Sequence, residues 1–101
     1  MKVFQRMNIV KDELQVICLD EETSKEEVLF SIDMTDFYWE PGHLKDNVLI
    51  DGEPNEEFLE NFCCDVPEAV EGRLSEEGVA VKGEVDFCDL FNDLLSRKFG
   101  I

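Results

Sequence analysis

The sequence predicts an α+β fold in which an antiparallel sheet is packed by two amphipathic helices. Two patterns indicate this class: the first third of the chain contains alternating apolar runs typical of strands, and two later segments repeat apolar residues at helical spacing. Chain length adds a third observation, because 101 residues suffice for one core and leave no room for a second. We therefore expect residues 1–101 to form a single compact acidic domain.

Three strands are expected in the N-terminal third. Residues 2–10 are rich in apolar side chains without helical spacing. In residues 14–19 and 28–34 every second residue is apolar, so that these side chains would share one face of a strand. The polar stretch 20–26 separates the second run from the third and indicates a turn. The strands should therefore form an antiparallel three-stranded meander.

The middle of the chain predicts a further short strand and then a helix. Residues 47–50 are the candidate strand, which ends at an Asp-Gly turn signal. Pro54 and the acids after it indicate the start of a helix, because carboxylates are favourable near a helix N-terminus. Apolar residues in the range 58–63 form one stripe, and Pro67 is expected to end this helix.

The last third contains an ambiguous segment and a clear helix. Residues 69–83 favour a hairpin around a Ser-Glu-Glu-Gly turn. After them, Asp86 is a good N-cap and Gly100 a good C-terminal cap. The apolar positions between these caps recur at helical spacing, and Arg97 and Lys98 match the negative end of the helix dipole.

Charge is the strongest signal in the sequence. Twenty-five acids against nine bases give a net charge of −16, and every acid lies between Asp12 and Asp93. The ends are basic: residues 1–11 sum to +3 and residues 94–101 to +2. Nucleic acids and anionic membranes repel such a chain, because affinity for a polyanion comes mainly from Lys and Arg. Direct nucleic-acid or membrane binding is therefore not expected.

The residues that would support catalysis or metal binding are sparse. The one histidine, His43, follows a Pro-Gly turn. It is therefore predicted to be a solvated loop residue rather than a catalytic base. The vicinal pair Cys63 and Cys64 does not match zinc-site spacing, and the acidic residues 51–57 lack the glycine of a calcium loop. We expect no enzyme, no cofactor and no metal site.

The cysteines and the N-terminus bear on location. With no apolar leader evident in the first residues, Cys18, Cys63, Cys64 and Cys88 are interpreted as free thiols in a reducing compartment. A cytoplasmic protein is therefore expected.

The acids gather in three places along the chain. These are a predicted hairpin tip around residues 20–27, a helix start around residues 51–60, and residues 76–89 near the last helix. Tyr38 and Trp39 are candidate aromatic anchors, because aromatic side chains often dominate binding energy. The alternative is that the aromatics of residues 37–39 close one end of the core. The predicted partner-binding residues are Asp36, Tyr38, Trp39, Glu40, Asp51, Glu53, Glu56, Glu57 and Glu60.

These features favour a non-enzymatic inhibitor that occludes the basic surface of a nuclease or another nucleic-acid-binding protein. In size, acidity and lack of catalytic residues the chain is similar to immunity proteins of nuclease toxins. It is similar in the same way to phage or mobile-element proteins that imitate the charge of DNA. An adaptor or accessory subunit with an apolar edge or groove is the alternative, its acidity serving only solubility. A small carboxylate enzyme or metal protein is a third hypothesis.

Overall fold

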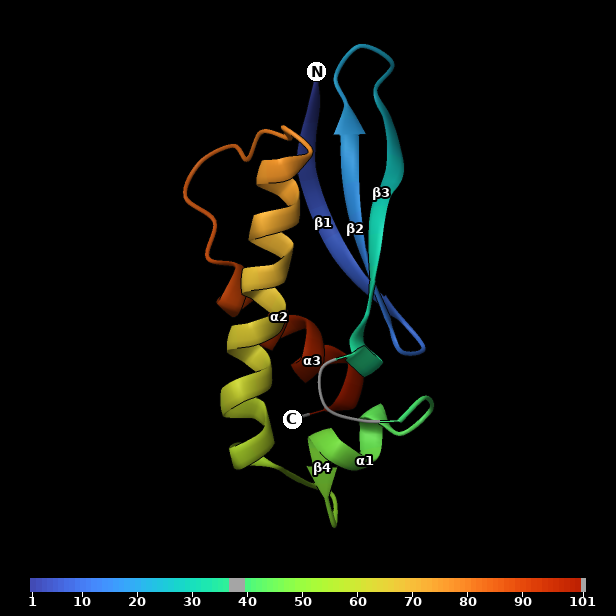
Figure 1. Cartoon of the computed structure of the whole chain (residues 1–101), viewed down its shortest axis with the longest axis vertical. Coiled ribbons are helices and arrows are strands. Elements are labelled where there is room, and N and C mark those ends of the chain that lie inside the picture. The colour runs from blue at the N-terminus through green and yellow to red at the C-terminus, as the bar shows by residue number, and fades with distance from the viewer. Residues whose placement is uncertain (37–39, 101) are drawn as a thin grey trace.

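The computed structural model describes residues 1–36 and 40–100, and it confirms the predicted α+β class. The molecule is elongated, with extents of 47 × 25 × 23 Å. A sheet occupies one end, a long helix runs beside it, and small elements close the other end (Figure 1).

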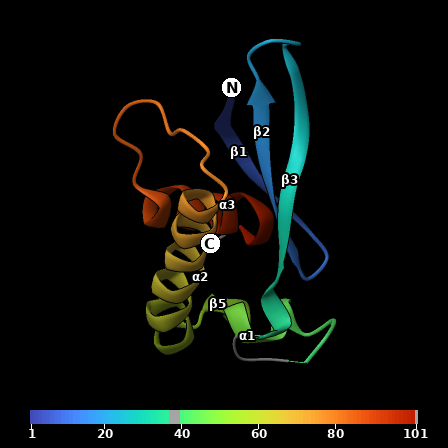
Figure 2. The same cartoon turned by 45° about the horizontal axis from the view of Figure 1, so that its top comes forward.

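The N-terminal sheet forms as predicted. Strands β1 (Lys2–Val10), β2 (Glu13–Asp20) and β3 (Lys25–Asp33) pair antiparallel in the order β1-β2-β3. The face that carries Leu14, Val16 and Cys18 joins the hydrophobic core, because these three side chains are completely buried. β1 lies nearest the helices, and β3 forms the far edge of the sheet (Figure 2).

Short elements link the sheet to the long helix. They are η1 (Met34–Asp36), α1 (Leu44–Val48), β4 (Leu49–Ile50) and β5 (Glu53–Pro54). The strand predicted over residues 47–50 is therefore only half present. Asn47 and Val48 belong to α1, where the buried side chain of Val48 packs in the core, and only Leu49 and Ile50 pair with β5. Asp51 and Gly52 both have positive φ, which is the turn conformation that an Asp-Gly pair favours.

The prediction that Pro67 ends the helix is wrong. Helix α2 runs from Glu56 to Glu76 with Pro67 inside it. Asn55 caps its start by accepting a hydrogen bond from the backbone N–H of Phe58. Pro67 is fully buried, and the helix continues beyond it because Val66, Val70 and Leu74 extend the apolar stripe into the core. Burial of that stripe outweighs the hydrogen bond that proline removes.

The predicted hairpin over residues 69–83 is also wrong. Its first half belongs to α2, and a turn at Gly78 leads into an extended segment. Within this segment Ala80 bridges to Val3 in parallel, with hydrogen bonds Phe4 N–H to Ala80 O (2.9 Å) and Ala80 N–H to Lys2 O (3.3 Å). Residues 79–81 therefore contact the outer edge of β1 instead of pairing with their own neighbours.

The last helix matches its prediction. α3 spans Phe87–Phe99; Asp86 caps it by accepting from the backbone N–H groups of Cys88 and Asp89, and Gly100 ends it with φ of 71°. α3 crosses α2, as the tilted view shows (Figure 2). The rings of Phe62 and Phe91, both fully buried, meet edge to face at this crossing with centroids 5.1 Å apart.

Candidate interaction surface

The acids at the β2–β3 end of the sheet are largely neutralised by bases of the same chain. Here Glu21 pairs with Lys82 at 2.8 Å, and Glu26 pairs with Arg6 at 3.2 Å. Glu27 forms an ion pair with Lys2. We call Glu21, Glu26 and Glu27 the tip acids. Because each has a cation within hydrogen-bond reach, their contribution to the outward field is reduced.

These pairs also shift proton affinities in the direction expected from their charges. The hydrogen bond and positive charge of Lys82 hold the pKa of Glu21 below its usual value. The hydrogen bond and negative charge of Glu27 raise the pKa of Lys2. Both lysine–glutamate ion pairs are solvent-exposed, so their strength remains sensitive to salt.

The acids between the β4–β5 turn and the end of α2 are in a different situation. Residues 51–76 contain nine acids and one base, a net charge of −8 and therefore half of the chain's −16. The one base, Arg73, places its guanidinium 4.4 Å from the centre of the Phe30 ring on β3. Its charge is thus directed toward the sheet, where it makes a cation–π contact.

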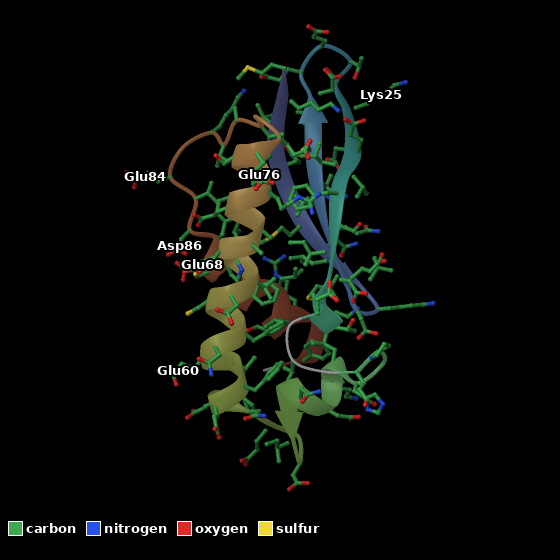
Figure 3. All side chains as sticks on the ribbon, viewed as in Figure 1. Lys25, Glu60, Glu68, Glu76, Glu84 and Asp86 are labelled. Carbon is green, nitrogen blue, oxygen red and sulfur yellow. The ribbon has the colours of Figure 1, made fainter. Side chains whose placement is uncertain are left out.

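Four of these acids form a continuous exposed face on α2. Glu57, Glu60, Glu68 and Glu71 are spaced so that they follow one side of a helix with 3.6 residues per turn. We call these four residues the α2 acidic face. Glu60 and Glu68 project from the side of α2 that is turned away from the sheet (Figure 3). Cys64 lies between them in sequence and is also exposed.

The α2 acidic face lacks the neutralising cations of the tip. In the described residues, no Lys, Arg or His nitrogen lies within 4.0 Å of a carboxylate oxygen of these four glutamates. Neighbouring like charges three residues apart repel each other and are costly to hold on one helix. Their negative field is therefore directed outward into solvent.

The predicted partner-binding residues fall into two groups. One group is continuous, because the β4–β5 hairpin leads directly into α2 and all five of its acids are exposed: Asp51, Glu53, Glu56, Glu57 and Glu60. The other group lies around η1, where Asp36 and Glu40 are exposed, while Tyr38 and Trp39 lie outside the described residues.

Sequence reasoning missed the second half of the acidic face. Glu68 and Glu71 belong to it only because α2 passes through Pro67. The signal that could have found them was the four-residue spacing of Val66, Val70 and Leu74, which continues the stripe that Phe62 begins.

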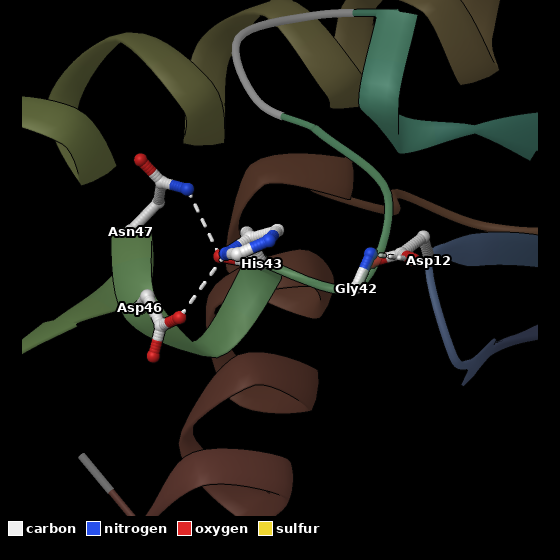
Figure 4. Close-up of polar contacts among 5 residues, drawn as sticks. All are labelled: Asp12, Gly42, His43, Asp46 and Asn47. Atoms are coloured by element: carbon white, nitrogen blue, oxygen red, sulfur yellow. Dashed lines mark hydrogen bonds and ion pairs between the residues drawn. The ribbon is translucent and has the colours of Figure 1, made fainter.

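His43 occupies the start of α1, as an exposed residue. Its Nδ1 lies 3.3 Å from Oδ2 of Asp46, and its carbonyl accepts a hydrogen bond from Asn47 (Figure 4). The preceding Gly42 donates its backbone N–H to Asp12 at 2.6 Å, which ties this loop to the β1–β2 turn. These contacts give His43 a local structural role at a helix start.

The cysteines are all free thiols. Cys18 and Cys63 are buried, Cys88 is half-buried, and burial raises the pKa of the Cys63 thiol to about 11. Within residues 1–36 and 40–100, no three His, Cys, Asp or Glu side chains are grouped as a metal site would need. In that same part of the chain, no helix combines the length and apolarity needed to cross a membrane.

Comparison with known proteins provides no relative from which a role could be transferred. No protein-family model matches the sequence, and neither curated proteins nor solved structures give a match.

Proposed function

We propose that this protein is a non-enzymatic binding protein whose α2 acidic face occludes the basic, nucleic-acid-handling surface of a partner protein. The observation that carries the proposal is the contrast in pairing: tip acids have cations of the same chain beside them, whereas the α2 acidic face has none among the described residues. Acids that remain uncompensated attract a cationic surface and speed its association.

The geometry of α2 also supports imitation of nucleic-acid charge. A 21-residue helix is about 30 Å long. Its seven acids therefore average one per about 4–5 Å of helix axis, close to the one negative charge per about 3.4 Å of axis that a single strand of duplex DNA carries. Arginines arranged to hold phosphates can hold carboxylates by the same paired hydrogen bonds. The proposed partner is thus a nuclease or another nucleic-acid-binding protein, in a toxin-immunity or phage antagonist setting.

Affinity requires more than attraction between charges. Tight complexes depend on a few desolvated anchors, and Tyr38 and Trp39 remain in the proposal as aromatic anchors flanked by the exposed acids Asp36 and Glu40. The free thiols support a further part of the proposal, a location in the reducing cytoplasm.

A second candidate is an adaptor that binds through the β3 edge. β3 is a terminal strand of its sheet, and Val28 on it is 48% exposed. An extended partner segment could add to such an edge through backbone hydrogen bonds. In this case the acidity would serve solubility, and binding would change little with salt.

The proposal is tested by comparing three immobilised baits in extracts of the native host at low salt. The baits are the wild type, a face variant with Glu60, Glu68 and Glu71 changed to Gln, and a tip variant with the tip acids changed to Gln. Both variants lose three negative charges, so a difference between them reports position rather than net charge.

We expect the wild type and the tip variant to retain the same basic nucleic-acid-binding proteins, which salt should elute. The face variant should retain much less of them. Equal retention by all three baits, or retention that high salt leaves intact, would contradict an electrostatic role for the α2 acidic face. Salt-resistant retention would instead favour the adaptor candidate.

A further inference from the structure

A groove runs between the outer edge of β1 and helix α3. It consists of two hollows, of about 540 Å³ and about 130 Å³, which share Gln5 and Leu90 in their walls. A hollow of this combined size falls within the range of small-ligand and peptide side-chain sites. Its apolar side chains are Phe4, Met7, Val81, Val85, Leu90 and Leu94.

The fold opens this groove through the segment that follows α2. Ala80 is hydrogen-bonded to β1, after which the chain arches outward and returns to the molecule at Asp86, where α3 begins (Figure 1). Val81 and Val85 therefore line the hollow from the arch, and Leu90 lines it from α3. Leu90 is 39% exposed although it lies on a helix whose other apolar residues pack in the core.

Charge at the groove favours a cation. All three bases in its walls are held by acids of this chain: Lys82 by Glu21, Arg6 by Glu26 and Arg97 by Asp93. The three other acids of its walls, Glu84, Asp86 and Asp89, have no Lys or Arg nitrogen within 4.0 Å in the described residues. A positively charged occupant would compensate them.

Two acids at the rim of the groove lie on the side of the molecule that the proposed function uses. Glu84 and Asp86 project toward the same side as Glu60 and Glu68 (Figure 3). One partner can therefore meet the α2 acidic face and the rim of the groove together.

We infer that the groove takes a short basic segment of the partner protein, with one large apolar side chain of that segment packed against Leu90. Its Lys or Arg residues would lie on Glu84, Asp86 and Asp89. This inference rests on the proposed function and supplies what the α2 acidic face lacks, an apolar anchor that excludes water. Long-range attraction then comes from α2, and the groove fixes the position of the partner.

The test uses two synthetic nine-residue peptides as probes against the full chain at low salt. The first alternates lysines with two leucines and a central tryptophan, and the second replaces those three residues by serine, so that the charge is the same. Binding is measured by the fluorescence anisotropy of a dye attached to each peptide. The binding site is located by amide shifts in NMR spectra of the protein. The variants are Leu90→Ser and, as a matched exposed apolar control on β3, Val28→Ser.

We expect the apolar peptide to bind wild type about tenfold more tightly than the serine peptide, because partial burial of its large side chain adds to the charge term. Leu90→Ser should abolish this preference, and Val28→Ser should keep it. A Glu84→Gln, Asp89→Asn double variant should weaken the binding of both peptides about equally, because it removes negative charge and leaves the apolar wall intact.

The outcomes distinguish a failure of the groove from a failure of the proposed function. A preference that survives Leu90→Ser, or amide shifts that fall on β3 instead of the groove, would overturn the groove while leaving the α2 acidic face in place. Failure of both peptides to bind wild type at low salt would overturn the proposed function and the groove with it.

Discussion

The tip acids and the α2 acidic face consist of the same residue type with similar exposure, yet they differ in what surrounds them. At the tip, the sheet brings side chains from β1 beside those of β3, so that Lys2 and Arg6 reach Glu27 and Glu26. On α2, the helix itself offers one base, Arg73, and this base is directed toward the sheet. The electrostatic field outside each region therefore depends less on how many acids it contains than on whether Lys or Arg side chains lie beside them.

The largest expected difference between the two regions is in association rate. Changing Glu60, Glu68 and Glu71 to Lys should slow binding of a labelled 20-residue lysine peptide by about tenfold or more at low salt, because the local field reverses. Stopped-flow anisotropy measures this rate. The matched control changes the three tip acids to Lys.

That control should slow association by only about twofold, because exposed charges are screened over about 10 Å at 0.1 M salt. The tip and the start of α2 lie at opposite ends of a molecule 47 Å long (Figure 1). Equal slowing by both triple variants would mean that net charge alone steers the peptide.

Cys64 provides a direct probe of the field at the α2 acidic face. A cationic thiosulfonate reagent should modify Cys64 faster than an anionic one. The ratio of the cationic to the anionic rate at Cys64 should be about five times the same ratio measured at a cysteine placed at the tip. The tip cysteine is introduced as Thr23→Cys in a Cys64→Ser background, and both proteins carry Cys88→Ser. Taking a ratio cancels differences in thiol reactivity. Similar ratios at the two sites would show that the potentials are similar.

Stability should respond with opposite signs in the two regions. The Glu60, Glu68, Glu71 to Gln variant should raise the free energy of unfolding by roughly 0.5–1 kcal/mol at low salt, because like charges three residues apart on a helix repel. The corresponding tip variant should lower it, since its acids lose their paired bases. Urea unfolding at about 0.01 M and about 1 M salt measures both, and both effects should shrink as screening increases. A destabilised face variant would contradict the assignment of repulsion to α2.

Local patterns in the sequence predicted the elements whose stability is local. The meander follows from alternation in the first third, and α3 follows from caps at Asp86 and Gly100 that the structure contains. The Asp-Gly turn at residues 51–52 likewise has the backbone that these residues favour. In each case one nearby set of residues decides the conformation.

Tertiary packing decided the elements that were mispredicted. Pro67 is a helix breaker by local rules, but it lies completely buried in a stripe that continues to Leu74. Ala80 bonds to β1, which is distant in sequence, rather than to a hairpin partner. The same long-range effects concealed the extent of the acidic face, because Glu68 and Glu71 join it only when α2 is continuous. The pairing of Glu21 with Lys82 spans 61 positions and has no local signature.

That long-range pair supplies the smallest expected effect. Because Lys82 holds the pKa of Glu21 low in the folded protein, the pair adds stability above the unfolded pKa of Glu21, and this is lost as pH falls through the folded pKa. Lys82→Gln should therefore raise the pKa of Glu21 toward its ordinary value, as NMR titration of its side-chain carboxyl would show. Lys45→Gln, an exposed lysine on α1, should leave it unchanged. If Lys82→Gln has no effect either, then Glu21 does not hold Lys82, and this lysine would be available to repel a basic segment from the groove.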